Sequence, residues 1–261
     1  MMPAAFIGHG SPMNAIENNR YTKAWSDFGS HVVETFGVPT AILCVSAHWY
    51  VGATAVTAME SPRQIYDFGG FPPRLSEFSY PAKGSTELAQ RVVDVLAPRQ
   101  VVSDQSSWGI DHGAWAILCH MFPKADVPVV QLSIDASKPA DFHLEIGGEL
   151  APLRNEGVLV VGSGNIVHNL SLIRWDMAGF GDEWAQRFDT EARRVLTGSS
   201  PGQIVDLLEH PDALLAVPTP EHFLPVVYIA GLAEAARSSL DVLIEGCEMG
   251  STSMTAFTLG G

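Results

Sequence analysis

Basic residues are scarce in this chain of 261 residues, which has 15 Lys and Arg against 29 Asp and Glu and a formal net charge of −14. Because phosphate binding needs clustered Lys and Arg, we expect no nucleic-acid partner. The same acidic balance argues against an anionic membrane surface. Apolar runs of membrane-spanning length, about 18 residues, are also missing. Even the apolar stretch 223–236 contains Pro225 and Glu234. We therefore expect no membrane partner either.

Cysteine is rare, and the three that occur, Cys44, Cys119 and Cys247, form no C-x-x-C pair. An odd, widely spaced set predicts neither a disulfide framework nor a Cys-based zinc site. Each cysteine lies in an apolar run, which is typical of an inert core thiol. Residues 1–10 have no basic region followed by a long apolar stretch, so we expect no signal peptide. These features together predict a cytoplasmic protein.

Standard catalytic motifs are absent as well. There is no G-x-S-x-G, no H-E-x-x-H and no G-x-x-x-x-G-K-[ST], which argues against an α/β-hydrolase, a zincin and a P-loop enzyme. Gly162-Ser163-Gly164 lacks the third glycine of a dinucleotide-binding loop. These absences leave the nine histidines as the main chemical resource of the chain.

Short apolar runs alternate with stretches of helical periodicity along the whole sequence. The expected strands are 4–7, 40–47, 53–58, 100–103, 127–134, 157–162, 241–247 and 254–258. The expected helices are 21–36, 85–96, 112–122, 139–153, 182–196, 202–208 and 222–236. This alternation predicts an α/β fold, with a mostly parallel central sheet and helices on both faces, in a single catalytic domain over residues 1–261. Segment 61–84, rich in Pro, Gly and aromatic residues, is too long for a simple connector and typical of a functional loop.

Five histidines lie at positions where an α/β sheet usually carries its functional residues. Ligands of α/β sheets bind beyond the carboxyl ends of the strands. His9 and His48 directly follow expected strands, His168 lies in the loop after a third, and His112 and His222 open expected helices. Neutral imidazole is a good ligand for Fe or Zn, so these side chains are candidates to converge on one ion. The remaining four are expected to be surface or hydrogen-bonded residues: His31, His120, His143 and His210.

Six sequence blocks, in order along nearly the whole chain, carry a family resemblance. They are residues 6–13 (FIGHGSPM), 45–49 (VSAHW), 66–72 (YDFGGFP), 108–113 (WGIDHG), 162–170 (GSGNIVHNL) and 218–225 (PTPEHFLP). With these blocks the sequence resembles the 4,5-DOPA extradiol dioxygenase family, a branch of the class III extradiol ring-cleavage dioxygenases.

The resemblance implies a non-haem metal held by His9, His48 and His222. It implies Fe(II) for activity, with Zn(II) expected in purified protein because zinc ranks higher in the divalent affinity order. His168 matches an acid/base histidine and is also a candidate fourth ligand, and His112 matches a histidine near the substrate. The implied reaction is meta cleavage of a catechol such as DOPA by O2.

One position departs from much of the superfamily, where two histidines and a glutamate hold the metal. Here Glu221 precedes His222, and we favour His222 as the ligand, which makes the shell one negative charge poorer. The loop from Tyr66 to Phe71 is expected either to wall the substrate or to pack as ordinary surface. Asp111 is interpreted as an exposed turn carboxylate rather than a partner that orients His112.

Other readings stay open at this point. One is a non-enzymatic metal-binding protein of the Memo type. Another is a zinc-dependent hydrolase, for which Glu221 is the one evident carboxylate base. A nucleophilic Ser11 beside His9 is a third. The expected assembly is a monomer or a small homo-oligomer.

Overall fold

A computed structural model describes residues 1–260 of the chain. Within them a central sheet has eight strands in the order β5-β3-β7-β2-β8-β1-β12-β9. Their bounds are β1 Ala4–Gly8, β2 Ala41–Val51, β3 Ala55–Thr57, β5 Val102–Asp104, β7 Val129–Asp135, β8 Val158–Gly164, β9 Asp241–Ile244 and β12 Ala256–Leu259. The block β7-β2-β8-β1 is parallel throughout, whereas β12 pairs antiparallel with β1, and β9 pairs antiparallel with β12. The predicted α/β fold with a mostly parallel sheet is confirmed.

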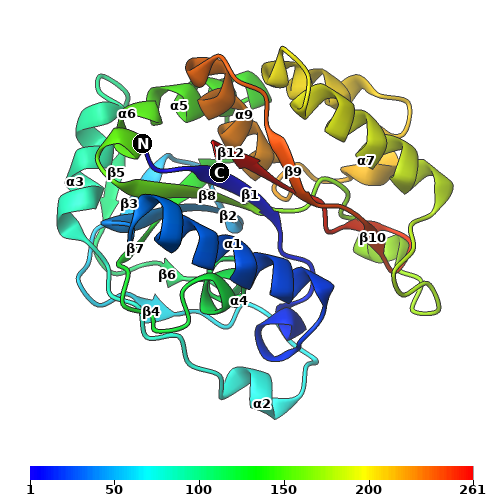
Figure 1. The fold of residues 1–261 in the computed structure, drawn as a ribbon, viewed down its shortest axis with the longest axis horizontal. Coiled ribbons are helices and arrows are strands. Elements are labelled where there is room, and N and C mark those ends of the chain that lie inside the picture. The colour runs from blue at the N-terminus through cyan, green and yellow to red at the C-terminus, as the bar shows by residue number, and fades with distance from the viewer. Residues whose placement is uncertain (261) are drawn as a thin grey trace.

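Helices cover both faces of this sheet (Figure 1). The face of α1 (Arg20–Phe36) and α4 (His112–Met121) is opposite the face of α5 (Ala140–Glu149) and α9 (Leu224–Ala236). The other helices are α3 Thr86–Val95, α6 Ala151–Asn155 and α7 Glu183–Leu196. Shorter elements are η1 Pro12–Ile16, α2 Pro73–Ser76, η2 Leu170–Leu172, η3 Pro201–Glu209, α8 Ala213–Ala216, β4 Arg63–Gln64, β6 Gly109–Ile110, β10 Cys247–Glu248 and β11 Thr252–Ser253.

Strand residues divide between two cores because successive side chains point to opposite faces. On β8, Val158 and Val160 belong to the core under α9, whereas Leu159 and Val161 belong to the core that contains Trp25 of α1. A strand buried on both faces needs an unbroken apolar run, and that is how β8 is recognised in the sequence. None of the helices in residues 1–260 combines the length and the apolar character needed to cross a membrane.

Several boundaries differ from those predicted, and proline explains two of them. Pro225 lies in the first turn of α9, where its missing N–H costs nothing, so the helix starts at Leu224 and His222 precedes it. Pro152 similarly starts a separate α6, which divides the predicted helix 139–153 into two. The predicted helix 202–208 is a 3₁₀ helix within η3.

The strand that carries His48 is longer than predicted. β2 continues to Val51, so His48 lies inside the strand and not after it. The register with β7 shifts between Val45 and Tyr50. This irregularity interrupts the pairing around His48, a device that re-aims side chains next to active sites.

The three cysteines form no disulfide. Cys44 and Cys247 are buried, as predicted, whereas Cys119 is partly exposed. Burial raises the pKa of the Cys119 and Cys247 thiols to about 12 and that of Cys44 well above its usual value. All three are therefore protonated and unreactive at neutral pH.

His143 of α5 is fully buried between α5 and α9, and its Nδ1 lies 2.9 Å from the Tyr228 hydroxyl oxygen. Burial lowers the pKa of His143 to about 4, although the nearby Asp135 opposes the shift. Its Nε2 has no hydrogen-bond partner, which adds to the cost of charging the ring in place.

We predict that His143 makes the fold acid-sensitive. The unfolded chain binds this proton near pH 6.5, so stability contributed by neutral His143 is present above that pH and is lost as pH falls toward 4. The loss amounts to about 3 kcal/mol over that window. Denaturant unfolding of His143→Gln at pH 7, 5.5 and 4 should show a shallower decline than the parent protein, with exposed His31→Gln as control. Parallel pH curves for the parent and His143→Gln would refute this role.

Candidate metal centre

The structure brings all five predicted histidines into one cluster at the carboxyl edge of β1, β2 and β8. Ring centroids are 5.1 Å apart for His9 and His48, 5.4 Å for His9 and His222, and 5.2 Å for His48 and His222. His112 lies 3.9 Å from His48, and His168 lies 3.5 Å from His222. The cause is topological, because β2, β8 and β1 are parallel neighbours whose carboxyl ends meet.

Three of these rings present ligand atoms to one point. Ligand atoms of His9, His48 and His222 lie within 4.8 Å of one another. The Nε2 atoms of His9 and His48 are 3.3 Å apart. Two imidazole nitrogens bound to one ion at about 2.0–2.1 Å, at a tetrahedral angle, are separated by roughly 3.3 Å. The donor set therefore fits a non-haem metal ion.

In each of the three candidate ligand histidines, the second ring nitrogen, Nδ1, contacts an oxygen atom of another side chain. Ser163 donates its hydroxyl to the Gly113 carbonyl at 2.5 Å, so it accepts from His9 Nδ1 at 3.0 Å. His48 Nδ1 faces Asp67 Oδ2 at 3.0 Å, and His222 Nδ1 faces Glu221 Oε1 at 3.3 Å. A proton on each Nδ1 leaves a bare lone pair on each Nε2, which is the tautomer that a metal ligand needs.

Two glycines allow the backbone to approach this closely. A Cβ on Gly113 would stand 2.5 Å from Ser46 Oγ and 2.8 Å from His48 Cδ2. A Cβ on Gly164 would stand 2.2 Å from the carbonyl oxygen of His222, to which Asn165 N donates at 2.8 Å. Both positions need glycine because any side chain would displace a ligand histidine or its backbone.

Electrostatics keep most of the cluster neutral. Burial lowers the pKa of His9 well below its usual value, and the neighbouring histidines lower it further. Burial likewise lowers the pKa of His222 to about 4 and that of His168 to about 3. For His48, burial acts to lower the pKa, but the hydrogen bond to Asp67 and nearby carboxylates outweigh it, so the net shift is upward.

Carboxylates in contact with these rings are strongly acidic. Burial acts to raise the pKa of Asp67, yet hydrogen bonds to His112 and His48 hold it well below its usual range. Burial also opposes ionisation of Glu221, but the His222 and Thr219 contacts lower its pKa to about 2. Glu221 is thus an ionised hydrogen-bond acceptor for Nδ1 of His222.

His112 starts α4 and is fixed by the long loop predicted to be functional. Asp67 Oδ1 accepts from His112 N at 3.1 Å and contacts His112 Nδ1 at 2.9 Å. Phe68 packs edge-on against His112 with a centroid distance of 5.5 Å, and Phe71 packs on Phe68 at 5.6 Å. The loop therefore lines one side of the cluster with aromatic rings.

Asp111 is not the exposed turn carboxylate that we predicted. Its side chain is fully buried and caps α4 through Ala114 N. It also accepts from Ser46 Oγ at 2.7 Å and from Gln131 Nε2 at 2.7 Å. A buried carboxylate needs such partners, and Asp111 has them both from β2 and β7 and from its own turn, where Trp108 Nε1 donates to Oδ2 at 3.2 Å.

His168 and His222 stack face to face with an interplanar angle of 8°. A metal lies near the plane of a ligating imidazole, and two rings stacked with centroids 3.5 Å apart do not both present a nitrogen in plane to one nearby position, although ligand atoms of His168, Glu221 and His222 lie within 4.8 Å of one another. In this arrangement the His168 ring faces the cluster without pointing at the same position as His222.

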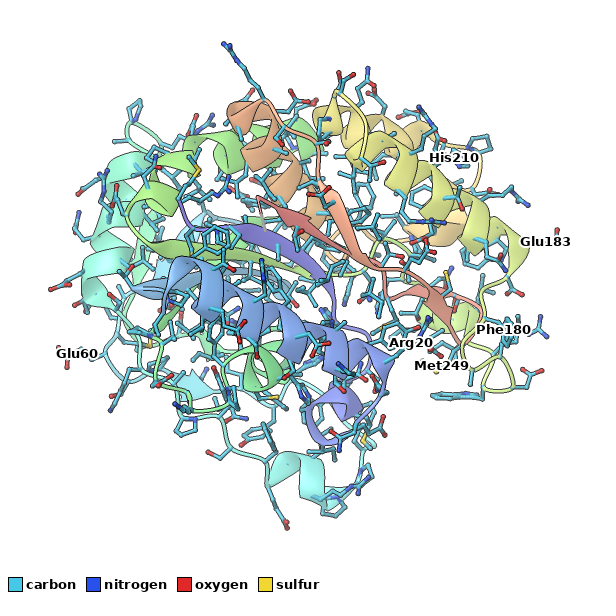
Figure 2. The ribbon with its side chains drawn as sticks, viewed as in Figure 1. Arg20, Glu60, Phe180, Glu183, His210 and Met249 are labelled. Atoms are coloured by element: carbon cyan, nitrogen blue, oxygen red, sulfur yellow. The ribbon has the colours of Figure 1, made fainter. Side chains whose placement is uncertain are left out.

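The remaining four histidines stay outside the cluster, as predicted. His31 is exposed on α1, and His120 Nε2 contacts the Asn14 carbonyl oxygen at 2.7 Å. His143 lies in the core between α5 and α9, and His210 lies beside α7 at the periphery (Figure 2). Asp67 and Ser163 were missed as partners of the histidines, although both fall inside the sequence blocks 66–72 and 162–170.

A mostly parallel α/β sheet with three convergent imidazoles at its carboxyl edge defines a class of protein whose site fits a non-haem metal. Residues 3–258 match the family described as the catalytic LigB subunit of aromatic ring-opening dioxygenase. The chain belongs to this LigB family, and the family resemblance drawn from its motifs is confirmed.

Similar proteins span nearly the full chain. One from Escherichia coli (strain K12), named 4,5-DOPA dioxygenase extradiol, is 48% identical over 262 residues, which covers 99% of this chain and 95% of that protein. One of the same name from Beta vulgaris is 38% identical over 231 residues, covering 87% and 85%. The crystal structure of an uncharacterized protein from Escherichia coli K12 matches with a TM-score of 0.86 and 44% identity over 100% of both chains. These findings make the chain a ring-cleaving dioxygenase.

We predict that Ser163→Ala weakens metal binding, because it removes the acceptor that keeps the proton of His9 on Nδ1. Loss of such an outer partner typically costs 10–100-fold in metal affinity. Competition titration of zinc against a chromophoric chelator measures the change. Ser133→Ala removes a buried serine of β7 whose hydroxyl bonds the backbone of Ala53 and Ala55 and none of the five clustered histidines. This control should leave zinc affinity unchanged, and equal affinities for the two variants would contradict the prediction.

Proposed function

We propose that residues 1–261 form one catalytic domain that cleaves a catechol such as DOPA by extradiol, O2-dependent ring opening. The observation that carries the proposal is the convergence of ligand atoms of His9, His48 and His222 beside two further histidines. The names of the relatives support the reaction type. We propose Fe(II) as the working ion, which when bound would supply the redox chemistry that lets O2 react with an aromatic diol.

His168 is proposed as the proton acceptor for the catechol hydroxyl, not as a fourth ligand. Its stacked orientation on His222 supports this assignment, because the two rings do not share an in-plane point. Its pKa, lowered to about 3 by burial and then by His222, keeps the ring neutral at neutral pH, so a ring nitrogen lone pair is available to accept a hydrogen bond from the catechol hydroxyl.

His112 is proposed to bind the substrate. Its Nδ1 is engaged by Asp67, so Nε2 is the atom free to hydrogen-bond a catechol oxygen. Phe68 and Phe71 are proposed to cover the aromatic ring and exclude water. An exposed fraction of 38% for Phe71 supports a position at the edge of the site rather than in the core.

Oxygen consumption tests the proposed reaction. We predict that protein reconstituted anaerobically with Fe(II) consumes one O2 per catechol and forms a yellow semialdehyde-type product when air is admitted. An oxygen electrode and visible absorption over a panel of substituted catechols measure both. Zinc-dependent hydrolysis without O2 uptake would favour the hydrolase instead. No product with verified Fe(II) loading would favour a binding protein of the Memo type.

Variants at His168 and His9 separate a base from a ligand. We predict that His168→Ala retains metal but loses 10²–10⁴-fold in kcat, the usual contribution of a general base. His9→Ala should lose metal binding altogether. Metal content by elemental analysis and steady-state kinetics give the two readouts. Loss of metal from His168→Ala would assign it as a ligand, and an unchanged turnover rate would remove its role as base.

A further inference from the structure

Asp67 stands at the junction of three features that are separate in the sequence. It lies in the aromatic loop, faces the ligand histidine His48 at 3.0 Å and faces the substrate-side histidine His112 at 2.9 Å. Its side chain is 19% exposed, so the contacts are largely shielded from water. No other carboxylate in residues 1–260 has oxygens within 4.0 Å of ring nitrogens of two of the five clustered histidines.

The two carboxylate oxygens are not equivalent. Oδ1 accepts from the His112 backbone N–H at 3.1 Å as well as from His112 Nδ1. Oδ2 faces His48 Nδ1 alone. Because a carboxylate only accepts, both rings carry a proton on Nδ1, and in the neutral form of each ring Nε2 is then bare.

We propose that Asp67 is a positioning residue that sets the tautomer of His48 and His112 together. Through Oδ2 it keeps the His48 Nε2 lone pair aimed at the metal position, and through Oδ1 it keeps His112 Nε2 an acceptor for a substrate hydroxyl. This inference rests on the proposed function for the identity of the metal and substrate positions.

The loop geometry adds a second consequence. Phe68, the next residue, packs on His112 and on Trp115, with centroid distances of 5.5 Å and 6.0 Å. The Tyr66 hydroxyl, on the preceding residue, donates to the Phe78 carbonyl at 2.7 Å. The carboxylate is thus held between two anchored aromatic residues, and displacement of the loop would release both histidines at once.

Asp67→Asn tests the proposal because an amide has one acceptor and one donor side. The backbone N–H of His112 must keep an oxygen at the Oδ1 position, so the NH2 group replaces Oδ2 and points at His48. His48 must then accept through Nδ1 and carry its proton on Nε2, which blocks metal binding through that atom. We predict a 10–100-fold loss of cobalt(II) affinity with little change in the environment of His112.

Two measurements read this out independently of turnover. Cobalt(II) titration followed by visible absorption gives affinity and stoichiometry, with one equivalent expected for the parent protein. Long-range ¹H–¹⁵N spectra of histidine-labelled apoprotein give tautomers. The parent should show Nδ1–H at both His48 and His112, and Asp67→Asn should show Nε2–H at His48. Glu77→Gln, an exposed acid of the same loop, is the matched control and should match the parent.

Three outcomes would overturn the proposal. The first is a parent spectrum in which the only ring proton of His48 or of His112 is on Nε2, which needs no variant at all. The second is an Asp67→Asn variant that binds cobalt(II) with the parental affinity. This result would count against the proposal even where limited proteolysis shows that the substitution loosens the loop. The third is a second cobalt equivalent lost only in Asp67→Asn, which would make His48, Asp67 and His112 a metal site of their own. Failure of catechol cleavage in the parent would instead refute the proposed function and leave the tautomer result standing.

Discussion

The parallel pairing of β2, β8 and β1 is the constraint on which the site depends. It brings His9 and His48 to the same edge, on either side of Ser163 in β8. Turning one of these strands around would carry its histidine to the opposite edge of the sheet. Burying several imidazoles together is costly unless their polar atoms are paired. In this structure each of the three candidate ligand rings has its own polar partner at Nδ1, and these contacts offset that cost.

Much of the fold and the identity of the histidines follow from local patterns. Apolar runs and helical periods locate the strands and helices, and strand ends locate His9. The partners behind the rings do not follow in this way, because His9 and Ser163 are 154 residues apart and Ser46 and Asp111 are 65 apart. Such contacts are created by tertiary packing, so local patterns predict Asp111 as a turn residue and predict no role for Asp67. They also predict too short a β2, because its apolar run ends at Ala47, before His48.

The outer partners also link the metal position to distant parts of the fold. Ser163 connects His9 to the first turn of α4 through the Gly113 carbonyl. Asp111 joins the same helix start to β2 and β7 through Ser46 and Gln131. A shift of α4 would therefore move the partner of His9 and the backbone of His112 together. The ligand geometry is set by the packing of one helix start against three strands.

Charge resolves the departure from the two-histidine, one-carboxylate pattern. Three neutral imidazoles contribute no negative charge to a divalent ion, whereas the usual carboxylate contributes one. Asp67 and Glu221 are both ionised at neutral pH, and each contacts a ligand ring through its Nδ1. Two negative charges therefore lie near the metal position, each separated from it by one imidazole ring. A divalent ion held by the three candidate ligands would be balanced by these two ionised carboxylates, so Asp67 and Glu221 would compensate its charge through imidazole and not by direct ligation. Glu221 then has a reason to stand beside His222 without replacing it.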